Sequence, residues 1–142
     1  MKIFEVTKNR GNLRFLPPPN KNFLGVVGQY KGFSTFQSQE LGDRALIKLL
    51  IGYISKGYNT IDKIVNRYAP SVENDTKKYV AFVVGFTGWN KDQRIEITKE
   101  NLFLLWDAII AKETGLNATH AQFEKAFALL DMSVKKKVLI VC

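Results

Sequence analysis

The sequence predicts an α+β fold that is mainly helical, with a small β element near the N-terminus. Apolar residues recur at helical spacing in five segments after position 41. Before them, glycines at positions 25, 28 and 32 interrupt a stretch of alternating apolar and polar residues. The length of 142 residues, 46% of them hydrophobic, suits one domain (residues 1–142) with a core of its own.

The N-terminal third carries the weaker signals. Residues 1–6 fit a short strand or the start of a helix, and Pro17–Pro19 set an extended segment. Residues 23–36 predict a short, bulged hairpin because glycines break the alternation.

Caps and stops predict the five helices. The first covers residues 42–56. Thr60 caps the second helix, which ends before Pro70, and Asn74 or Asp75 caps the third, which ends at Gly88. Thr98 caps the fourth helix, which runs to about Glu113 and is followed by Gly115. Thr119 caps the fifth, and Gln122 completes its capping box. Residues 138–141 are rich in β-branched side chains and fit an edge strand.

Composition limits the function classes. No apolar run approaches the ~18 residues of a membrane span, and the first residues lack the apolar centre of a signal peptide. The single cysteine, Cys142, cannot form an internal disulfide. A net charge of +8 favours an anionic partner: nucleic acid, acidic lipid or bacterial cell wall.

The sequence contains few groups for catalysis other than carboxylates. The one histidine, His120, lies in a capping segment without a nucleophile motif, no phosphate-binding loop is present, and no metal-ligand cluster is visible. We therefore expect no metal and no cofactor, and carboxylate chemistry remains.

Glu113 is the most informative acid. It lies on one helical face with Leu102, Trp106 and Ile109, at the negative end of the helix dipole. Apolar neighbours and that dipole favour the protonated form of a carboxyl, which is the form that a glycosidase uses to protonate a departing sugar oxygen. The alternative is a solvent-exposed Glu113 paired with Lys112.

Glu40 and Glu73 differ from Glu113 because each lies near a helix start, where the dipole favours the charged form. That position suits a base, an electrostatic stabiliser or a simple cap. Side chains that suit sugar rings by hydrogen bonding or stacking are Asn12, Arg14, Tyr68, Asn74 and Tyr79. Trp106, at helical spacing, fits the core better than a sugar site.

Together these segments resemble a family of small phage-encoded proteins, found as virion or lysis proteins and treated as lysozyme-like muralytic domains. The resemblance is carried by Asn9–Arg14, by Phe33–Ala45 with Gly42 and Arg44 retained, by Tyr68–Tyr79 with Glu73, Asn74 and Thr76, and by Glu113–Gly115. Arg10 and Gln39 stand where that family has proline.

The first two segments also resemble the region that follows the catalytic helix in bacterial autolysin glucosaminidases. Those enzymes carry an acid at a helix end before this region, and here the helix ending at Glu113 would supply it from the other end of the chain. The resemblance thus implies a lysozyme-like fold related to those enzymes by circular permutation.

The resemblance implies a bacteriophage peptidoglycan glycosidase: a muramidase, a glucosaminidase or a lytic transglycosylase. Glu113 would be the general acid and Glu73 or Glu40 a base or stabiliser, and the groove would be lined by Asn12, Arg14, Tyr68, Asn74, Thr76 and Tyr79. Such a protein would act on glycan strands, from the virion or from the host cytoplasm before lysis, with other virion proteins as further partners.

Two alternatives stay open. One is a non-catalytic virion or wall-binding protein of the same fold, which the changes at Arg10 and Gln39 allow. The other is a basic nucleic-acid-binding protein, which is disfavoured because aromatic residues do not alternate with Lys and Arg along one segment.

Overall fold

The computed structural model describes residues 2–69 and 75–139 and confirms a mainly helical α+β class with a small antiparallel sheet near the N-terminus. None of the helices in these two ranges is long and apolar enough to cross a membrane. The elements in chain order are α1 (Ile3–Thr7), β1 (Val26–Tyr30), β2 (Phe33–Phe36), α2 (Gln39–Ser55), α3 (Ile61–Tyr68), α4 (Thr76–Thr87), α5 (Lys99–Thr114), α6 (His120–Ala128) and α7 (Met132–Lys135).

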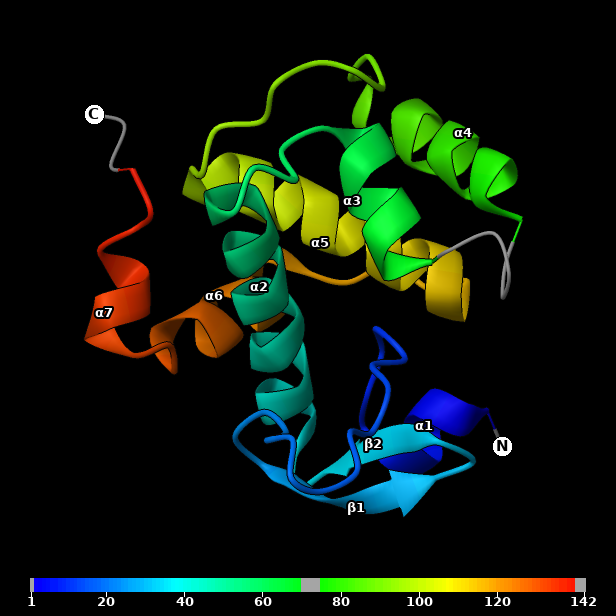
Figure 1. Cartoon of the computed structure of the whole chain (residues 1–142), viewed down its shortest axis with the longest axis vertical. Coiled ribbons are helices and arrows are strands. Elements are labelled where there is room, and N and C mark those ends of the chain that lie inside the picture. Colours follow the sequence, from blue (N-terminus) through cyan, green and yellow to red (C-terminus); the bar gives the residue numbers. More distant parts are fainter. Residues whose placement is uncertain (1, 70–74, 140–142) are drawn as a thin grey trace.

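Helices α2 and α5 lie at the centre, with α3 and α4 on one side and α6 and α7 on the other (Figure 1). Helix α2 packs against both α5 and α6, and α4 packs against α3 and α5. The apolar faces meet in one buried cluster that includes Leu46, Ile64, Val83 and Phe123. Trp106 is fully buried in this cluster, which confirms its prediction as a core residue.

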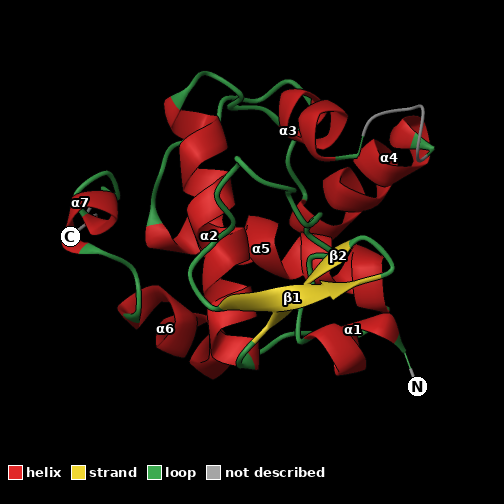
Figure 2. Ribbon diagram, turned by 60° about the horizontal axis from the view of Figure 1, so that its bottom comes forward, coloured by secondary structure: helices red, strands yellow, loops and turns green. Residues whose placement is uncertain are grey.

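The hairpin and α1 lie together at one end of the molecule (Figures 1 and 2). Residues 3–7 form a helix, so the helical alternative for the N-terminus is the one adopted. Strands β1 and β2 pair antiparallel with an irregularity between Val26 and Gly28, as the predicted bulge requires. Lys31 and Gly32, both at positive φ, form the turn between them.

The predicted caps are confirmed, with one boundary moved. Thr60, Thr98 and Thr119 each accept a hydrogen bond from the backbone N–H three residues on, and of the two candidates for α4 it is Asp75 that does so. Helix α2 starts at Gln39 rather than at residue 42, because the Ser38 hydroxyl accepts the Leu41 N–H.

The C-terminal part differs from the prediction in two places. Helix α7 was not predicted, because its four residues are too few to show an apolar stripe at helical spacing. Of the predicted edge strand at 138–141, the described part forms one parallel bridge, in which the Leu139 N–H donates to the Ile97 carbonyl at 2.7 Å. Residues 140 and 141 lie outside the described ranges.

The start of α2 is packed closely against the N-terminal segment. A Cβ added at Gly42 would collide with the Lys8 carbonyl oxygen, so only glycine allows this approach. Arg44, buried in the same turn, donates from Nε to the Leu129 carbonyl at 3.0 Å. Gly42 therefore lets the N-terminal segment pack on α2, and Arg44 ties α2 to the end of α6.

Candidate active site

A cleft of about 370 Å³ opens where the N-terminal segment meets the helical body. It brings together four of the predicted site residues, Glu113, Asn12, Arg14 and Tyr68. The remaining lining residues come from the segment before the hairpin, from α2 and from the end of α3: Leu13, Leu16, Phe23, Leu49, Tyr53, Arg67 and Ala69.

Glu113 occupies the last turn of α5 and is half-buried. The Asn12 side chain donates from Nδ2 to Glu113 Oε1 at 2.9 Å. Gly115, at φ 74°, ends the helix directly behind it, and the Lys2 amine donates to the Thr114 carbonyl at 3.2 Å. The carboxyl is therefore held at a fixed helix end that faces the cleft.

The segment 9–14 is folded by its own side chains. Asn9 is buried and makes three hydrogen bonds: its amide donates to the carbonyls of Leu13 (3.0 Å) and Ser34 (2.9 Å), and its oxygen accepts the Leu13 N–H (3.0 Å). This closes a loop in which Asn12 adopts φ 52°, a conformation that asparagine tolerates better than most residues. The amide of Asn12 is thereby presented to Glu113.

The loop is also pressed against α3. The Tyr68 hydroxyl donates to the Gly11 carbonyl. A Cβ added at Gly11 would lie 3.0 Å from that hydroxyl oxygen and 3.2 Å from Leu46, so a side chain there would push the loop away. Gly11 thus sets the distance between the loop and the wall of the cleft.

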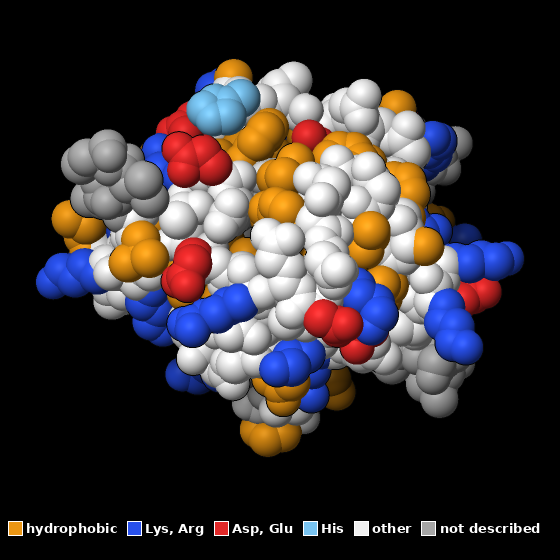
Figure 3. All heavy atoms as spheres, turned by 90° about the horizontal axis from the view of Figure 1, so that it is seen from above, with side chains coloured by type: hydrophobic (Ala, Val, Ile, Leu, Met, Phe, Trp, Pro, Cys, Tyr) orange, Lys and Arg blue, Asp and Glu red, His pale blue; other side chains and the backbone are white. Residues whose placement is uncertain are grey.

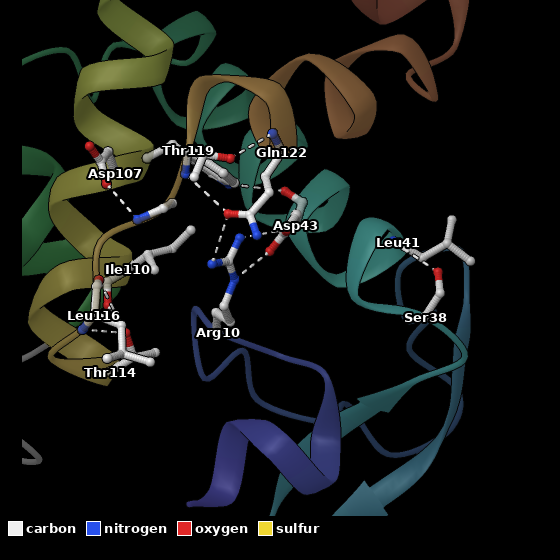
Figure 4. Close-up of polar contacts among 12 residues, drawn as sticks. Arg10, Ser38, Leu41, Asp43, Asp107, Ile110, Thr114, Leu116, Thr119 and Gln122 are labelled. Atoms are coloured by element: carbon white, nitrogen blue, oxygen red, sulfur yellow. Dashed lines mark hydrogen bonds and ion pairs between the residues drawn. The ribbon is translucent and has the colours of Figure 1, made fainter.

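Arg10 does not line the cleft, and its side chain points toward Asp43 and Gln122 (Figure 4). It holds Asp43 with two hydrogen bonds, from Nε at 3.1 Å and from Nη2 at 2.8 Å, and its Nη1 reaches Gln122 at 3.4 Å. The guanidinium also lies 5.6 Å from the Trp106 ring centre. Arg10 therefore anchors the loop on α2 and α6 from outside the cleft.

Burial raises the pKa of Asp43, although the hydrogen bonds and the charge of Arg10 act in the opposite direction. Asp43 is 3% exposed and Arg10 6%, so neither is available to a ligand. This carboxylate belongs to the fold.

Two tyrosines lie beneath Glu113. Burial, and then the negative charge of Glu113, raise the pKa of Tyr68 well above its usual value. Burial likewise raises the pKa of Tyr79, with smaller effects from Tyr68 and Glu113. Although the Glu113 charge reaches the Tyr79 hydroxyl, no described residue makes a well-oriented hydrogen bond with that hydroxyl. Both phenols stay protonated, and Tyr79, 2% exposed, supports the site from below rather than lining it.

The other predicted residues lie elsewhere. Glu40 is exposed in the first turn of α2 and does not line the cleft. Thr76 is buried, donates to the Ala69 carbonyl at 2.8 Å, and borders a separate hollow between α3 and α4. Glu73 and Asn74 lie outside the described residues.

Among the cleft residues that were not predicted from the sequence, three carry an aromatic ring or a charge. Phe23 and Tyr53 add aromatic surface, and Arg67 adds a cation. Arg67 directly precedes Tyr68 in the third segment, and this adjacency was the available signal.

The chain is similar to a bacteriophage protein. It is 34% identical over 97 residues to Protein P5 of Pseudoalteromonas phage PM2, a match that covers 67% of this chain and 59% of that protein. The chain thus matches less than two thirds of that relative's length. No protein-family model matches the chain.

The chemistry of the cleft is that of a carboxyl beside aromatic and amide groups. Within residues 2–69 and 75–139, no group of three or more His, Cys, Asp or Glu side chains is placed to hold a metal ion. A half-buried carboxyl can transfer a proton, amides can bind hydroxyl and acetamido groups, and aromatic rings can stack on the apolar faces of sugars.

Proposed function

We propose that this protein is a bacteriophage peptidoglycan glycosidase with a lysozyme-like active site, in which Glu113 is the general acid. The observation that carries the proposal is the position of Glu113: at a helix end, half-buried, bound by the Asn12 amide and facing a cleft with aromatic walls. The similarity to a phage protein supports a phage setting.

In this proposal the glycan strand lies in the cleft with the bond to be broken next to Glu113. The carboxyl gives its proton to the glycosidic oxygen as the bond to the sugar carbon breaks. Neutral Asn12 holds the carboxyl in position without supplying a compensating charge. Phe23, Tyr53 and Tyr68 offer rings for stacking along the strand.

The second step separates hydrolysis from transglycosylation. Glu113 is the one carboxylate among the described residues that line the cleft. With one acid, the ionised Glu113 can take the proton from the sugar's own C6 hydroxyl, whose oxygen then bonds to the anomeric carbon and gives an anhydro sugar end. Hydrolysis by two carboxylates would need a second acid at about 5–9.5 Å, and this role stays with Glu73, because Glu40 does not line the cleft.

The electrostatic setting suits an anionic wall polymer. Lys and Arg side chains are spread across the face seen in Figure 3 and are mixed there with Asp and Glu. With a net charge of +8, the protein is drawn to anionic polymers over a broad area.

The test is digestion of purified peptidoglycan followed by mass spectrometry of the soluble fragments. We expect fragments ending either in reducing sugars or in anhydro sugars that lack one water. Release of free peptides alone would contradict a glycosidase. Tight wall binding without any release would instead support the non-catalytic wall-binding alternative.

A further inference from the structure

Arg67 is a cleft residue with no role in the mechanism above. It lies in the last turn of α3, next to Tyr68, with an exposed side chain. Its guanidinium carbon lies 5.5 Å from the ring centre of Tyr58, and Tyr58 meets Tyr53 edge to face at 6.1 Å. The Tyr58 ring, which packs on Tyr53, restrains a long side chain that would otherwise be free to rotate.

The charge of Arg67 is directed to the cleft wall. It acts to lower the pKa of Tyr53, although burial of that cleft residue has the larger effect and raises it. In the described part of the chain, Arg10, Arg44 and Arg94 each form an ion pair with a carboxylate, and Arg67 forms none. Arg67 therefore presents a guanidinium whose preferred partner, a carboxylate, is not supplied by those residues.

Arg67 also borders a second hollow. A depression of about 350 Å³ runs along the outer face of α3, where Arg67 is joined by Tyr58, Asp62, Lys63 and Asn66. The cleft and this depression share Arg67, so a branch that leaves a polymer in the cleft can continue past the guanidinium onto α3.

We infer that Arg67 determines specificity by binding a carboxylate on the peptide branch of the wall polymer; this inference rests on the proposed function. The N-acetylated sugar rings carry no charge, whereas the branches attached to every second sugar carry carboxylates. The planar guanidinium fork matches a carboxylate with two parallel hydrogen bonds. The protein then selects branched, anionic strands over neutral sugar polymers of the same backbone.

The experiment compares two forms of one substrate. Purified peptidoglycan, free of secondary wall polymers, is used either untreated or after its carboxylates are coupled to methylamine as neutral amides. Initial rates at limiting substrate are measured for the wild type and for Arg67→Met, Arg67→Lys and Lys125→Met. Lys125 is exposed on α6, so its replacement removes one positive charge outside the cleft.

We expect the wild type to digest the untreated wall about tenfold faster or more than the amidated wall, as the loss of a charged hydrogen bond implies. Arg67→Met should digest both forms at the slow rate. Arg67→Lys should keep part of the preference, because the charge remains and the fork is lost. Lys125→Met should keep all of it.

Three outcomes would overturn the inference. The folded Arg67→Met variant could still digest the untreated wall faster than the amidated wall, or the wild type could digest both walls at equal rates. Arg67→Met could also lose the same factor in rate on both walls. If Arg67→Met does not fold, full preference in Arg67→Lys decides against the carboxylate fork. Absence of digestion of either wall by the wild type refutes the proposed function, a result distinct from loss of preference alone.

Discussion

One loop, residues 9–14, contacts two carboxylates in different regions of the molecule, one through a charged donor and the other through a neutral one. At the start of α2, Asp43 is 3% exposed and receives two hydrogen bonds from the Arg10 guanidinium. At the end of α5, Glu113 is half-buried and receives one from the Asn12 amide at 2.9 Å. Asp43 is paired with a cation and is not accessible to a ligand. Glu113 faces the cleft and forms no ion pair with any described residue.

Under the proposed function, the difference separates a structural carboxylate, Asp43, from a catalytic one, Glu113. A buried carboxylate with a matched guanidinium is fully occupied, and its removal leaves a buried cation unpaired. A carboxylate held by a neutral donor keeps an oxygen for a substrate and can gain and lose a proton. The predictions below, from the largest expected effect to the smallest, test whether the two sites are as different as their contacts indicate.

Glu113→Gln tests the chemical side. An amide has nearly the same shape but cannot donate the proton, so we expect digestion of peptidoglycan to fall ~10²- to 10⁴-fold with the fold intact. The assay is release of soluble fragments, with circular dichroism as the check on folding. Glu100→Gln, at the exposed opposite end of the same helix, is the matched control and should retain the wild-type rate. A folded Glu113→Gln protein with wild-type digestion would remove Glu113 from the mechanism.

Asp43→Ala tests the structural side. This variant leaves the buried Arg10 guanidinium without its carboxylate partner. We therefore expect the free energy of unfolding to fall by about 3–5 kcal/mol in urea denaturation. The double variant Arg10→Met/Asp43→Leu removes both charges and should recover most of that loss. A cost under ~1 kcal/mol for the single variant would mean that the guanidinium finds water, and that the pair does not fix the loop.

The sequence predicts where the helices that carry the two carboxylates begin and end better than it predicts the residues that contact those carboxylates. Helix caps such as Thr98 and Gly115 act within a few residues, so the end of α5 and hence the position of Glu113 along its helix could be predicted. The partners of Glu113 and Asp43 lie 101 and 33 residues away in the chain, and no local pattern encodes such pairings. Arg10 stands where the family that this chain resembles has proline, and no local pattern predicts that it pairs with Asp43 and anchors the loop.

The same limit explains the residues that were misplaced or missed. Tyr79 and Thr76 share a sequence segment with Tyr68, but the helical turns carry them into the core and toward another hollow. Arg67 and Tyr53 come to one cleft from different helices, which only the packing of α2 against α3 decides.

Asn12→Gly tests whether the hydrogen bond from the loop to Glu113 contributes to the rate of digestion. Glycine adopts φ 52° without strain, so the variant removes the amide and leaves the backbone conformation available. We expect a loss of about tenfold in the rate of digestion, from a hydrogen bond to a chargeable group, with little change in substrate affinity. Asn12→Ala is the matched comparison: it should lose the same rate and in addition be less stable by ~1 kcal/mol, because alanine disfavours the left-handed conformation. Equal rates for wild type and Asn12→Gly would show that Glu113 does not need this contact.

The smallest effect concerns the sign of the Asp43 titration. Because burial outweighs Arg10 and raises the pKa of Asp43, the folded protein holds this proton more firmly than the unfolded chain does. The contribution of Asp43 to stability is then fully present below the ordinary aspartate pKa and is lost as the pH rises through the raised value. Asp43→Asn cannot titrate, so the free energy of unfolding of the wild type minus that of this variant should decrease as the pH rises from about 3 toward neutral. Urea denaturation of both proteins across that range gives the slope. An increase instead would mean that Arg10 stabilises the charged carboxylate by more than burial costs it, and that the pair at α2 is a net source of stability.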